Sequence, residues 1–497
     1  MEKIEILNNR LKKIYKYTTA LNLINWDMLT CTPDASIDVM VDTSAELSTR
    51  IMKMKTCDSM GKLLEALLCE EEFKKLNDVE RETVKRLKKE YDEYKNVPMD
   101  FYEEYQKTIG KAQEVWAKAK NKNDYNAFKK YLEKMINMAK EMVKYRKPGC
   151  LDIYNEMIND YEEGMNTEML DKLFSEIKNY VIPFMKKIND TNNNSNNKKD
   201  RNERYGVNAQ KEVSNFLLKY IGFDLERGIV GESEHPFTMS ISYGDTRLTN
   251  HYYDDDFINP VFSIIHEGGH GIFEQNIDKK YKYTPMEVIN YLGLHESQSR
   301  FFENILGRNI NFWKPIFEDV KNILPEYKGS LEDFYNTINV VRPNLIRINS
   351  DEVSYCLHII LRYEIERDLF NGKLGVEELP QAWNDKMKEY LGITPDSDSE
   401  GILQDSHWSG GSFGYFPTYL LGSIYDGMFL EKIEEELGSV DEILERGEIK
   451  KITKWLNKNI HKYGSSIKPV ELVEKVCEKK VTAVPLIEYF KRKYELG

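Results

Sequence analysis

The strongest chemical signal in the sequence is a pair of histidines four residues apart, His266 and His270, in the stretch HEGGH. Residues four apart lie on one face of an α-helix, so a helix here would direct both imidazoles to one point. This pattern is typical of a zinc peptidase in which the intervening Glu267 is the general base. Two core histidines on an amphipathic helix are the alternative. Gly268 and Gly269 disfavour it, because each glycine costs a helix about 1 kcal/mol relative to alanine unless something must approach closely.

A third metal ligand is expected downstream, in the stretch HESQSR that begins at His295. Glu296 is the favoured ligand and His295 is the competing one. Neighbouring residues on a helix point about 100° apart, so we do not expect both to bind one metal. Three protein ligands leave the fourth position of a tetrahedral zinc site for water, as a catalytic site requires.

Capping signals predict where the two ligand-bearing helices begin. Asn259 is a good N-cap residue and Pro260 suits the first helical position, so the first helix is expected to start there. Thr284 and Glu287 have the spacing of a capping box, which predicts the start of a second helix that carries Glu296.

The residues just before the first helix alternate between apolar and polar types. Residues 235–243 have a period of two, Gly244 follows as a turn residue, and residues 247–252 form a second short run. This predicts a small β-hairpin beside the metal helix. An edge strand there could pair with an extended peptide, or the hairpin could merely pack on the helices.

Most of the remaining chain has the apolar spacing of helices, as in residues 128–142. Residues 190–199, rich in asparagine and lysine, form the only low-complexity segment. We expect one domain over residues 1–497, with a helical layer over about 1–190, a flexible loop at 190–203 and a catalytic half at 204–497. A domain boundary at the loop is the alternative.

Composition disfavours several classes of partner. The chain has 83 acidic and 70 basic residues, and its net charge of −13 disfavours nucleic acid and anionic membrane surfaces. The N-terminal stretch lacks the apolar centre of a signal peptide, and no apolar run reaches the roughly 20 residues of a membrane helix. The six scattered cysteines form no CxxC pair, which fits free thiols in a reducing cytoplasm.

Six short motifs, taken in order, resemble those of the carboxypeptidase Taq family of metallocarboxypeptidases. They are His235-Pro236-Phe237, Asp245 to Thr249 (DTRLT), the HEGGH described above, His295 to Gln298 (HESQ), Ile346 to Asp351 (IRINSD) and Gly401 to Trp408 (GILQDSHW). The N-terminal Trp26-Asp27 and Pro33 resemble that family as well, so the similarity covers the whole chain. The chain differs at Asn250-His251, where the family commonly has Thr-Arg. We expect this to alter contacts with substrate rather than the chemistry.

With the helical pattern, the resemblance implies a mainly α fold: a large single-domain peptidase with a deep central cleft and a small β-hairpin or sheet beside the zinc helix. It implies one zinc ion per chain, with cobalt as the alternative, held by His266, His270 and Glu296. It further implies removal of C-terminal residues from peptides with a free C-terminus, broad specificity, and commonly a homodimer. We assign His235 and Arg247, from the first two motifs, to substrate binding.

Two further catalytic roles need residues outside the metal motif. Arg347 is the candidate clamp for the terminal carboxylate of the substrate, because its guanidinium can bind a carboxylate with two hydrogen bonds. A structural salt bridge from Arg347 to Asp351 or Glu352 is the alternative. Tyr415 or His407 could donate a hydrogen bond to the oxyanion.

Two other functions would use the same residues. An endopeptidase or oligopeptidase has the same metal chemistry. A helical peptide-binding protein with an inactive HExxH motif is the non-enzymatic alternative. The intact ligand set and Glu267 argue against inactivity.

Overall fold

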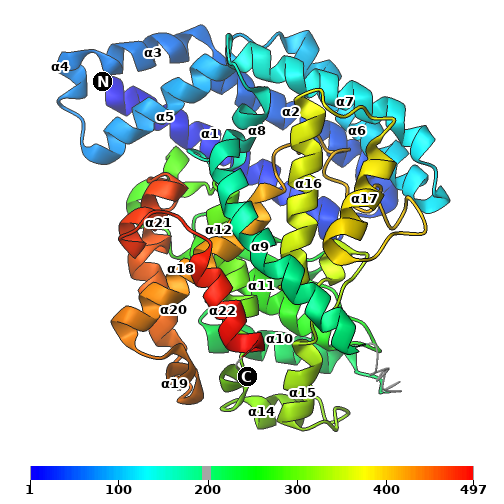
Figure 1. The fold of residues 1–497 in the computed structure, drawn as a ribbon. Coiled ribbons are helices and arrows are strands. Elements are labelled where there is room, and N and C mark those ends of the chain that lie inside the picture. The colour runs from blue at the N-terminus through cyan, green and yellow to red at the C-terminus, as the bar shows by residue number, and fades with distance from the viewer. Residues whose placement is uncertain (1, 193–202, 496–497) are drawn as a thin grey trace.

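Helices build almost the whole molecule. The structure is a computed structural model, and it describes residues 2–192 and 203–495 (Figure 1). The first part of the chain forms α1 (Lys3–Thr30), α2 (Ile37–Thr56), α3 (Asp58–Leu68), α4 (Glu70–Phe73), α5 (Asp78–Tyr94), α6 (Met99–Lys122), α7 (Tyr125–Arg146), α8 (Ile153–Tyr161) and α9 (Thr167–Asn192). The helical prediction for this part is confirmed. The loop predicted at 190–203 begins later than expected, because residues 190–192 continue α9, and residues 193–202 lie outside the described part of the chain.

The second part carries the candidate metal ligands. Its helices are α10 (Val207–Ile221), α11 (Ile258–Gln275), α12 (Leu292–Arg300), α13 (Ile310–Trp313), α14 (Phe317–Ile323), α15 (Leu331–Ile338), α16 (Ser354–Phe370), α17 (Leu379–Leu391), α18 (Pro417–Leu437), α19 (Val440–Glu445), α20 (Lys450–Asn459), α21 (Pro469–Cys477) and α22 (Val484–Tyr494). A π-helical stretch, Phe301–Leu306, continues α12. None of the described helices is long and apolar enough to cross a membrane.

Two of the hydrophobic clusters among the described residues join most of these helices. The larger cluster runs from α6 to α22 and includes α9, α11, α12, α16 and α18. A smaller one joins α1, α3 and α5 through residues such as Leu7, Leu64 and Val84. The first helices therefore have a core of their own and lie over the catalytic part as a layer, in the upper part of Figure 1.

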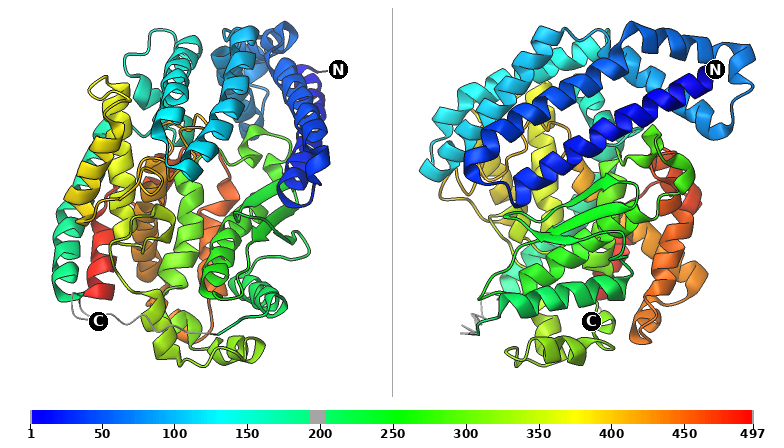
Figure 2. Two further views of the ribbon diagram at one scale, coloured as in Figure 1. Left: turned by 90° about the vertical axis from the view of Figure 1, so that its right-hand side faces the viewer. Right: turned by 180° about the vertical axis from the view of Figure 1, so that it is seen from behind.

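A three-stranded sheet lies between α1 and α11, as the right-hand view of Figure 2 shows. It consists of β1 (Val230–Glu232), β2 (Thr238–Ser242) and β3 (Asp245–Asn250) in the order β1-β3-β2. The predicted hairpin is β2–β3, antiparallel and closed at Gly244. Strand β1, which pairs in parallel with β3, was not predicted, because three residues are too few to show alternation.

The predicted start of α11 is wrong by two residues. The helix begins at Ile258, and the carboxylate of Asp256 accepts hydrogen bonds from the backbone N–H groups of Ile258 (2.8 Å) and Asn259 (3.2 Å). Asp256 therefore caps this helix in place of Asn259, and the N–H groups that it satisfies come earlier in the chain. Pro260 is the third helical residue, where an intrahelical N–H bond is not required in any case.

The predicted capping box closes a short turn instead of opening α12. Thr284 accepts a hydrogen bond from Met286 N, and Glu287 accepts one from Tyr283 N at 2.7 Å, which gives the 3₁₀ turn Pro285–Glu287. The hydroxyl of Ser465 then bonds to the backbone on both sides of Ile289: it donates to the carbonyl of Val288 and accepts from the N–H of Asn290. This long-range contact keeps the segment extended, so α12 starts only at Leu292.

Candidate active site

Three ligand atoms of the predicted metal site converge. Glu296 Oε2 lies 3.8 Å from His266 Nε2 and 3.7 Å from His270 Nε2, and the three side chains can offer ligand atoms within 4.8 Å of one another. Two ligands bound at about 2.0–2.1 Å in tetrahedral geometry lie roughly 3.4 Å apart. The imidazole–imidazole–carboxylate set therefore fits a zinc-like ion in both donor type and spacing.

Glycines allow the two ligand helices to approach closely. A Cβ atom on Gly269 of α11 would lie 2.6 Å from the carbonyl oxygen of Gln298 in α12, and one on Gly268 would meet Leu218 of α10 at 2.8 Å. On the other side of α12, a Cβ on Gly422 of α18 would lie 3.1 Å from Glu296 Cγ. The expectation that the glycines of HEGGH serve close packing is confirmed.

A carboxylate behind His266 orients its ring. His266 Nδ1 lies 2.9 Å from Glu303 Oε2, and Arg308 contacts the other oxygen of Glu303 at 3.4 Å. The bond between His266 Nδ1 and Glu303 fixes the ring so that Nε2 faces His270 and Glu296. Burial opposes charge on His266, but Glu296 and Glu303 outweigh it and raise its pKa to about 9. Glu303 was missed in the sequence, although it follows Glu296 by seven residues, two helical turns, on the same face.

His295, the competing ligand, points elsewhere. Its Nε2 lies 3.1 Å from Glu274 Oε1, and its ring stacks on His270 at 3.9 Å between centroids. Burial, with His295 and His266 nearby, holds the pKa of His270 well below its usual value. His270 is therefore neutral, the form that binds metal, and the geometry favours Glu296 over His295.

Glu267 lies buried between α11 and the edge strand. The hydroxyl of Thr238 in β2 donates to Glu267 Oε2 at 2.6 Å, and burial raises the pKa of this carboxyl. The predicted base is thus oriented by the hairpin that precedes it. The carbonyl of Ser240, further along β2, accepts a hydrogen bond from Asn22 of α1 at 3.1 Å, so α1 covers part of this edge.

Arg347 is buried in a network that differs from the predicted salt bridges. Its Nε and Nη2 donate to Asp405 Oδ1 at 3.0 and 2.9 Å, and its Nη1 donates to the hydroxyl of Tyr355 at 2.9 Å. The proposed partners Asp351 and Glu352 are occupied elsewhere: the first caps the start of α16, and the second binds Lys493. Among the described residues, Nη1 and Nη2 of Arg347 each keep one N–H without a partner.

Both predicted oxyanion donors lie beside Arg347. The guanidinium of Arg347 lies 4.9 Å from the ring of Tyr419, whose hydroxyl lies 3.1 Å from His407 Nε2. Burial lowers the pKa of His407 to about 4 and raises that of Tyr415 to about 12, so both are neutral near pH 7. The ring of Tyr415 lies 5.2 Å from those of both Tyr419 and His407, so its hydroxyl belongs to the same group of side chains.

Comparison with known proteins agrees with this arrangement. The sequence profile of the family described as carboxypeptidase Taq (M32) metallopeptidase matches residues 6–494. The chain belongs to this family. Carboxypeptidase 1 of Bacillus subtilis is 39% identical over 490 residues, which cover 97% of this chain and 96% of the relative. Thermostable carboxypeptidase 1 of Thermus thermophilus is 34% identical and covers 95% and 94%. The structure of metallocarboxypeptidase 1 of Trypanosoma cruzi has a TM-score of 0.94 at 30% identity, over 99% of each chain.

As an M32 carboxypeptidase, the protein is a hydrolase that acts on the C-terminal residues of peptides. Its mainly helical fold with a small sheet is that of M32 carboxypeptidases, so the fold-class prediction is confirmed. A metal ion is implied by the family, and the His266–His270–Glu296 cluster is the candidate site for it among the described residues.

Two residues assigned to substrate binding lie apart from this M32 centre. His235 is exposed. Its backbone carbonyl accepts a hydrogen bond from the hydroxyl of Ser233. Arg247 is paired with Asp245 through two hydrogen bonds of 2.9 and 3.0 Å, and its guanidinium lies 5.5 Å from the ring of Trp26. The structure brings neither side chain to the metal ligands, and their roles in binding remain predictions.

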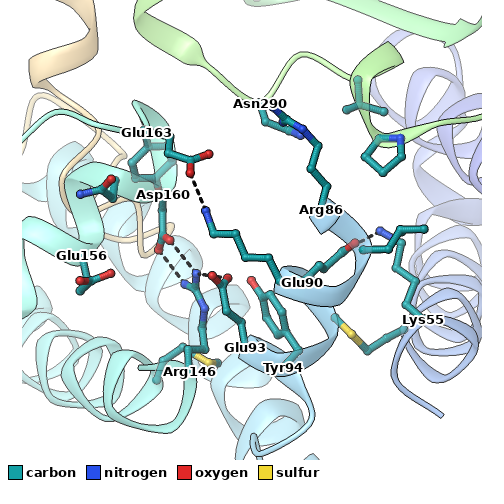
Figure 3. A pocket seen from close by; sticks show the side chains of 18 of the residues that line it. Lys55, Arg86, Glu90, Glu93, Tyr94, Arg146, Glu156, Asp160, Glu163 and Asn290 are labelled. Carbon is teal, nitrogen blue, oxygen red and sulfur yellow. Dashed lines mark hydrogen bonds and ion pairs between the residues drawn. The ribbon is translucent and has the colours of Figure 1, made fainter. Parts of the chain in front are cut away.

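A cavity of about 750 Å³ lies between the N-terminal helices and the segment before α12. Its charged residues pair across the walls, Lys55 with Glu90 and Arg146 with Asp160 and Glu93 (Figure 3). The metal ligands do not line it. Tyr161 does, and its ring lies 5.1 Å from that of Tyr415. Tyr161 is therefore the residue of the cavity wall that contacts Tyr415.

Proposed function

We propose that the protein is a zinc-dependent carboxypeptidase of broad specificity, with His266, His270 and Glu296 as the ligands. The observation that carries the proposal is the convergence of these three donors beside the buried Glu267. Cobalt is the alternative metal, because the same donor set suits it. Bound zinc would act as a Lewis acid that makes a water molecule more acidic and polarises the scissile carbonyl.

The residues of the chain divide the rest of the chemistry. Glu267 accepts the proton of the attacking water and passes it to the leaving amine. Tyr415, which is neutral near pH 7, donates a hydrogen bond to the developing oxyanion, and His407 bonds to the neighbouring Tyr419. The two free N–H groups of Arg347 bind the terminal carboxylate of the substrate.

Other parts of the molecule support the remaining proposals. The edge strand β2 holds the peptide backbone beside Glu267. Because most of the cavity charges, Glu156 excepted, are paired with one another, the walls carry little net preference for charge on the upstream part of a peptide, which supports broad specificity. All six cysteines are free, which supports a cytoplasmic location.

Four exposed apolar residues on α1 and α2 support a homodimer: Leu23, Leu29, Val39 and Val41. Sedimentation analysis would test this oligomeric state.

The products of a defined peptide test the function directly. Incubation of a free-acid peptide with the zinc-loaded protein should give a ladder of successive single-residue losses from the C-terminus, read by mass spectrometry. The C-terminal amide of the same peptide should be cut poorly. Internal cuts, or equal rates on acid and amide, would replace this proposal with the endopeptidase alternative.

Substitution of Arg347 by alanine tests the carboxylate clamp. A charge-assisted hydrogen bond contributes about 1.5–3 kcal/mol, so kcat/KM on free-acid peptides should fall by roughly 10- to 100-fold. Hydrolysis of the matching amides should change little, because they lack the group that Arg347 binds. The ratio of acid to amide rates, measured on one preparation, is therefore the deciding quantity.

Arg347 also neutralises the buried Asp405, so a matched control is needed. Arg362 donates to the other oxygen of Asp405 at 2.7 Å and is fully buried, which makes R362K the control for damage to this ion pair. R362K should lower stability and leave the ratio of acid to amide rates unchanged. A ratio that shifts equally in both variants would assign Arg347 a structural role only.

A further inference from the structure

The buried carboxyl group of Glu162 lies at the start of the ligand-bearing helix α12. Glu162 follows α8 and has no exposed surface. Its Oε2 accepts a hydrogen bond from the N–H of Gly293 at 2.9 Å, and its Oε1 accepts one from the hydroxyl of Tyr425 at 3.0 Å. A Cβ atom on Gly293 would lie 2.9 Å from the Glu162 carboxyl, so glycine is what permits this contact.

Glu162 performs the role of an N-cap from a distant part of the chain. The first N–H groups of a helix have no acceptor within the helix. Tyr291, the N-cap residue of α12, supplies no side-chain acceptor, and Glu162 replaces it from 131 residues upstream. Because burial raises the pKa of the Glu162 carboxyl to about 8, its hold on α12 depends on hydrogen bonds rather than on charge.

The neighbouring Glu163 fixes the same helix start. Glu163 Oε2 accepts a hydrogen bond from the hydroxyl of Tyr291 at 3.1 Å, and Arg86 donates to that hydroxyl at 3.0 Å. Lys89 binds the other oxygen of Glu163 at 2.9 Å. Figure 3 shows Glu163, Arg86 and Asn290 around this part of the cavity. The connection between α8 and α9 thus holds both the first turn of the α12 backbone and the side chain of its N-cap residue, Tyr291.

Through Tyr425, Glu162 also joins α12 to α18. Tyr425 lies on α18 three residues after Gly422, the glycine that packs against Glu296. The hydrogen bonds of Glu162 therefore set the position of α12 along α18, one helical turn before the ligand. A shift of this turn would move the Glu296 carboxylate away from His266 and His270.

We propose that Glu162 is a positioning residue for the metal site: it fixes α12 so that Glu296 meets the two histidines, although it binds no metal itself. The inference rests on the proposed ligand set. Loss of groups that orient metal ligands typically weakens metal binding by about 10- to 100-fold. The affinity of the apoprotein for zinc, rather than activity alone, is therefore the quantity to measure.

Zinc affinity is measured by competition with a chromophoric chelator, with folding checked by circular dichroism. E162A should weaken zinc binding by about 10- to 100-fold. In E162Q the amide oxygen can still accept from the N–H of Gly293, and the amide N–H can donate to the hydroxyl of Tyr425. This variant should therefore bind zinc within about threefold of wild type. Should E162A fail to fold, E162D draws the carboxyl back by one methylene and should give a smaller loss in the same direction.

Glu366 provides a matched control. It is also fully buried, and it accepts hydrogen bonds from Trp408 Nε1, Gly414 N and the hydroxyl of Tyr154, none of which lies on α12. E366A should lose stability and keep wild-type zinc affinity. Folded E162A with wild-type affinity, or equal weakening in E366A, would overturn the positioning role alone. A wild-type protein that binds no metal would overturn the ligand set and this inference together.

Discussion

Replacement of Glu267 by glutamine is expected to lower kcat by at least about 10²-fold and to leave the metal in place. Glutamine keeps the size of the side chain and can still accept the hydrogen bond that Thr238 donates at 2.6 Å. It cannot accept a proton from water, so the loss reports the base alone. Parallel measurement of kcat on a free-acid peptide and of metal content on the same preparation checks this result.

The same substitution seven residues later on α11 is the control. Glu274 contacts His295 rather than the centre of the metal ligands, so E274Q should cost far less than E267Q. An E267Q variant that turns over peptides within tenfold of wild type would remove Glu267 from the role of base. Loss of metal from E267Q would instead show that the residue supports binding of the ion.

The residues of the candidate metal centre could be found in the sequence because their arrangement is local. His266, Glu267 and His270 lie within two turns of one helix, where spacing alone fixes which side chains share a face. The β2–β3 hairpin was predictable for the same reason, since alternation and the turn at Gly244 are local signals. Glu296 needed the resemblance as well, because spacing alone left His295 as a competitor.

The parts that sequence reasoning missed depend on contacts between distant segments. Asp405 lies 58 residues from Arg347, so the sequence pointed instead to the neighbouring Asp351 or Glu352 as the ion-pair partner. Ser465 keeps the residues after Glu287 extended, so a correct local capping signal predicted the wrong helix. Glu162 acts on α12 across 131 residues, and no periodicity in either segment indicates that the two meet.

Removal of one metal ligand should have the largest effect of all. H266A is expected to lose most of its metal and its activity together, while the wild type holds about one ion per chain. Only two metal ligands, His270 and Glu296, would remain. Glu303 would also lose its hydrogen bond to His266 Nδ1, which is 2.9 Å long in the wild type. Elemental analysis after dialysis, with kcat/KM measured on the same samples, checks both losses.

H295A is the decisive companion, because His295 lies next to Glu296 and stacks on His270 at 3.9 Å between ring centroids. It removes an imidazole of the same size from the same region, yet His295 bonds to Glu274 and should contribute no bond to the metal. H295A should therefore keep its ion, and E296Q should lose it. Full occupancy in H266A would contradict the ligand set. An ion lost from H295A but retained by E296Q would assign the third ligand to position 295, and α12 would then have to rotate by about 100° to present it.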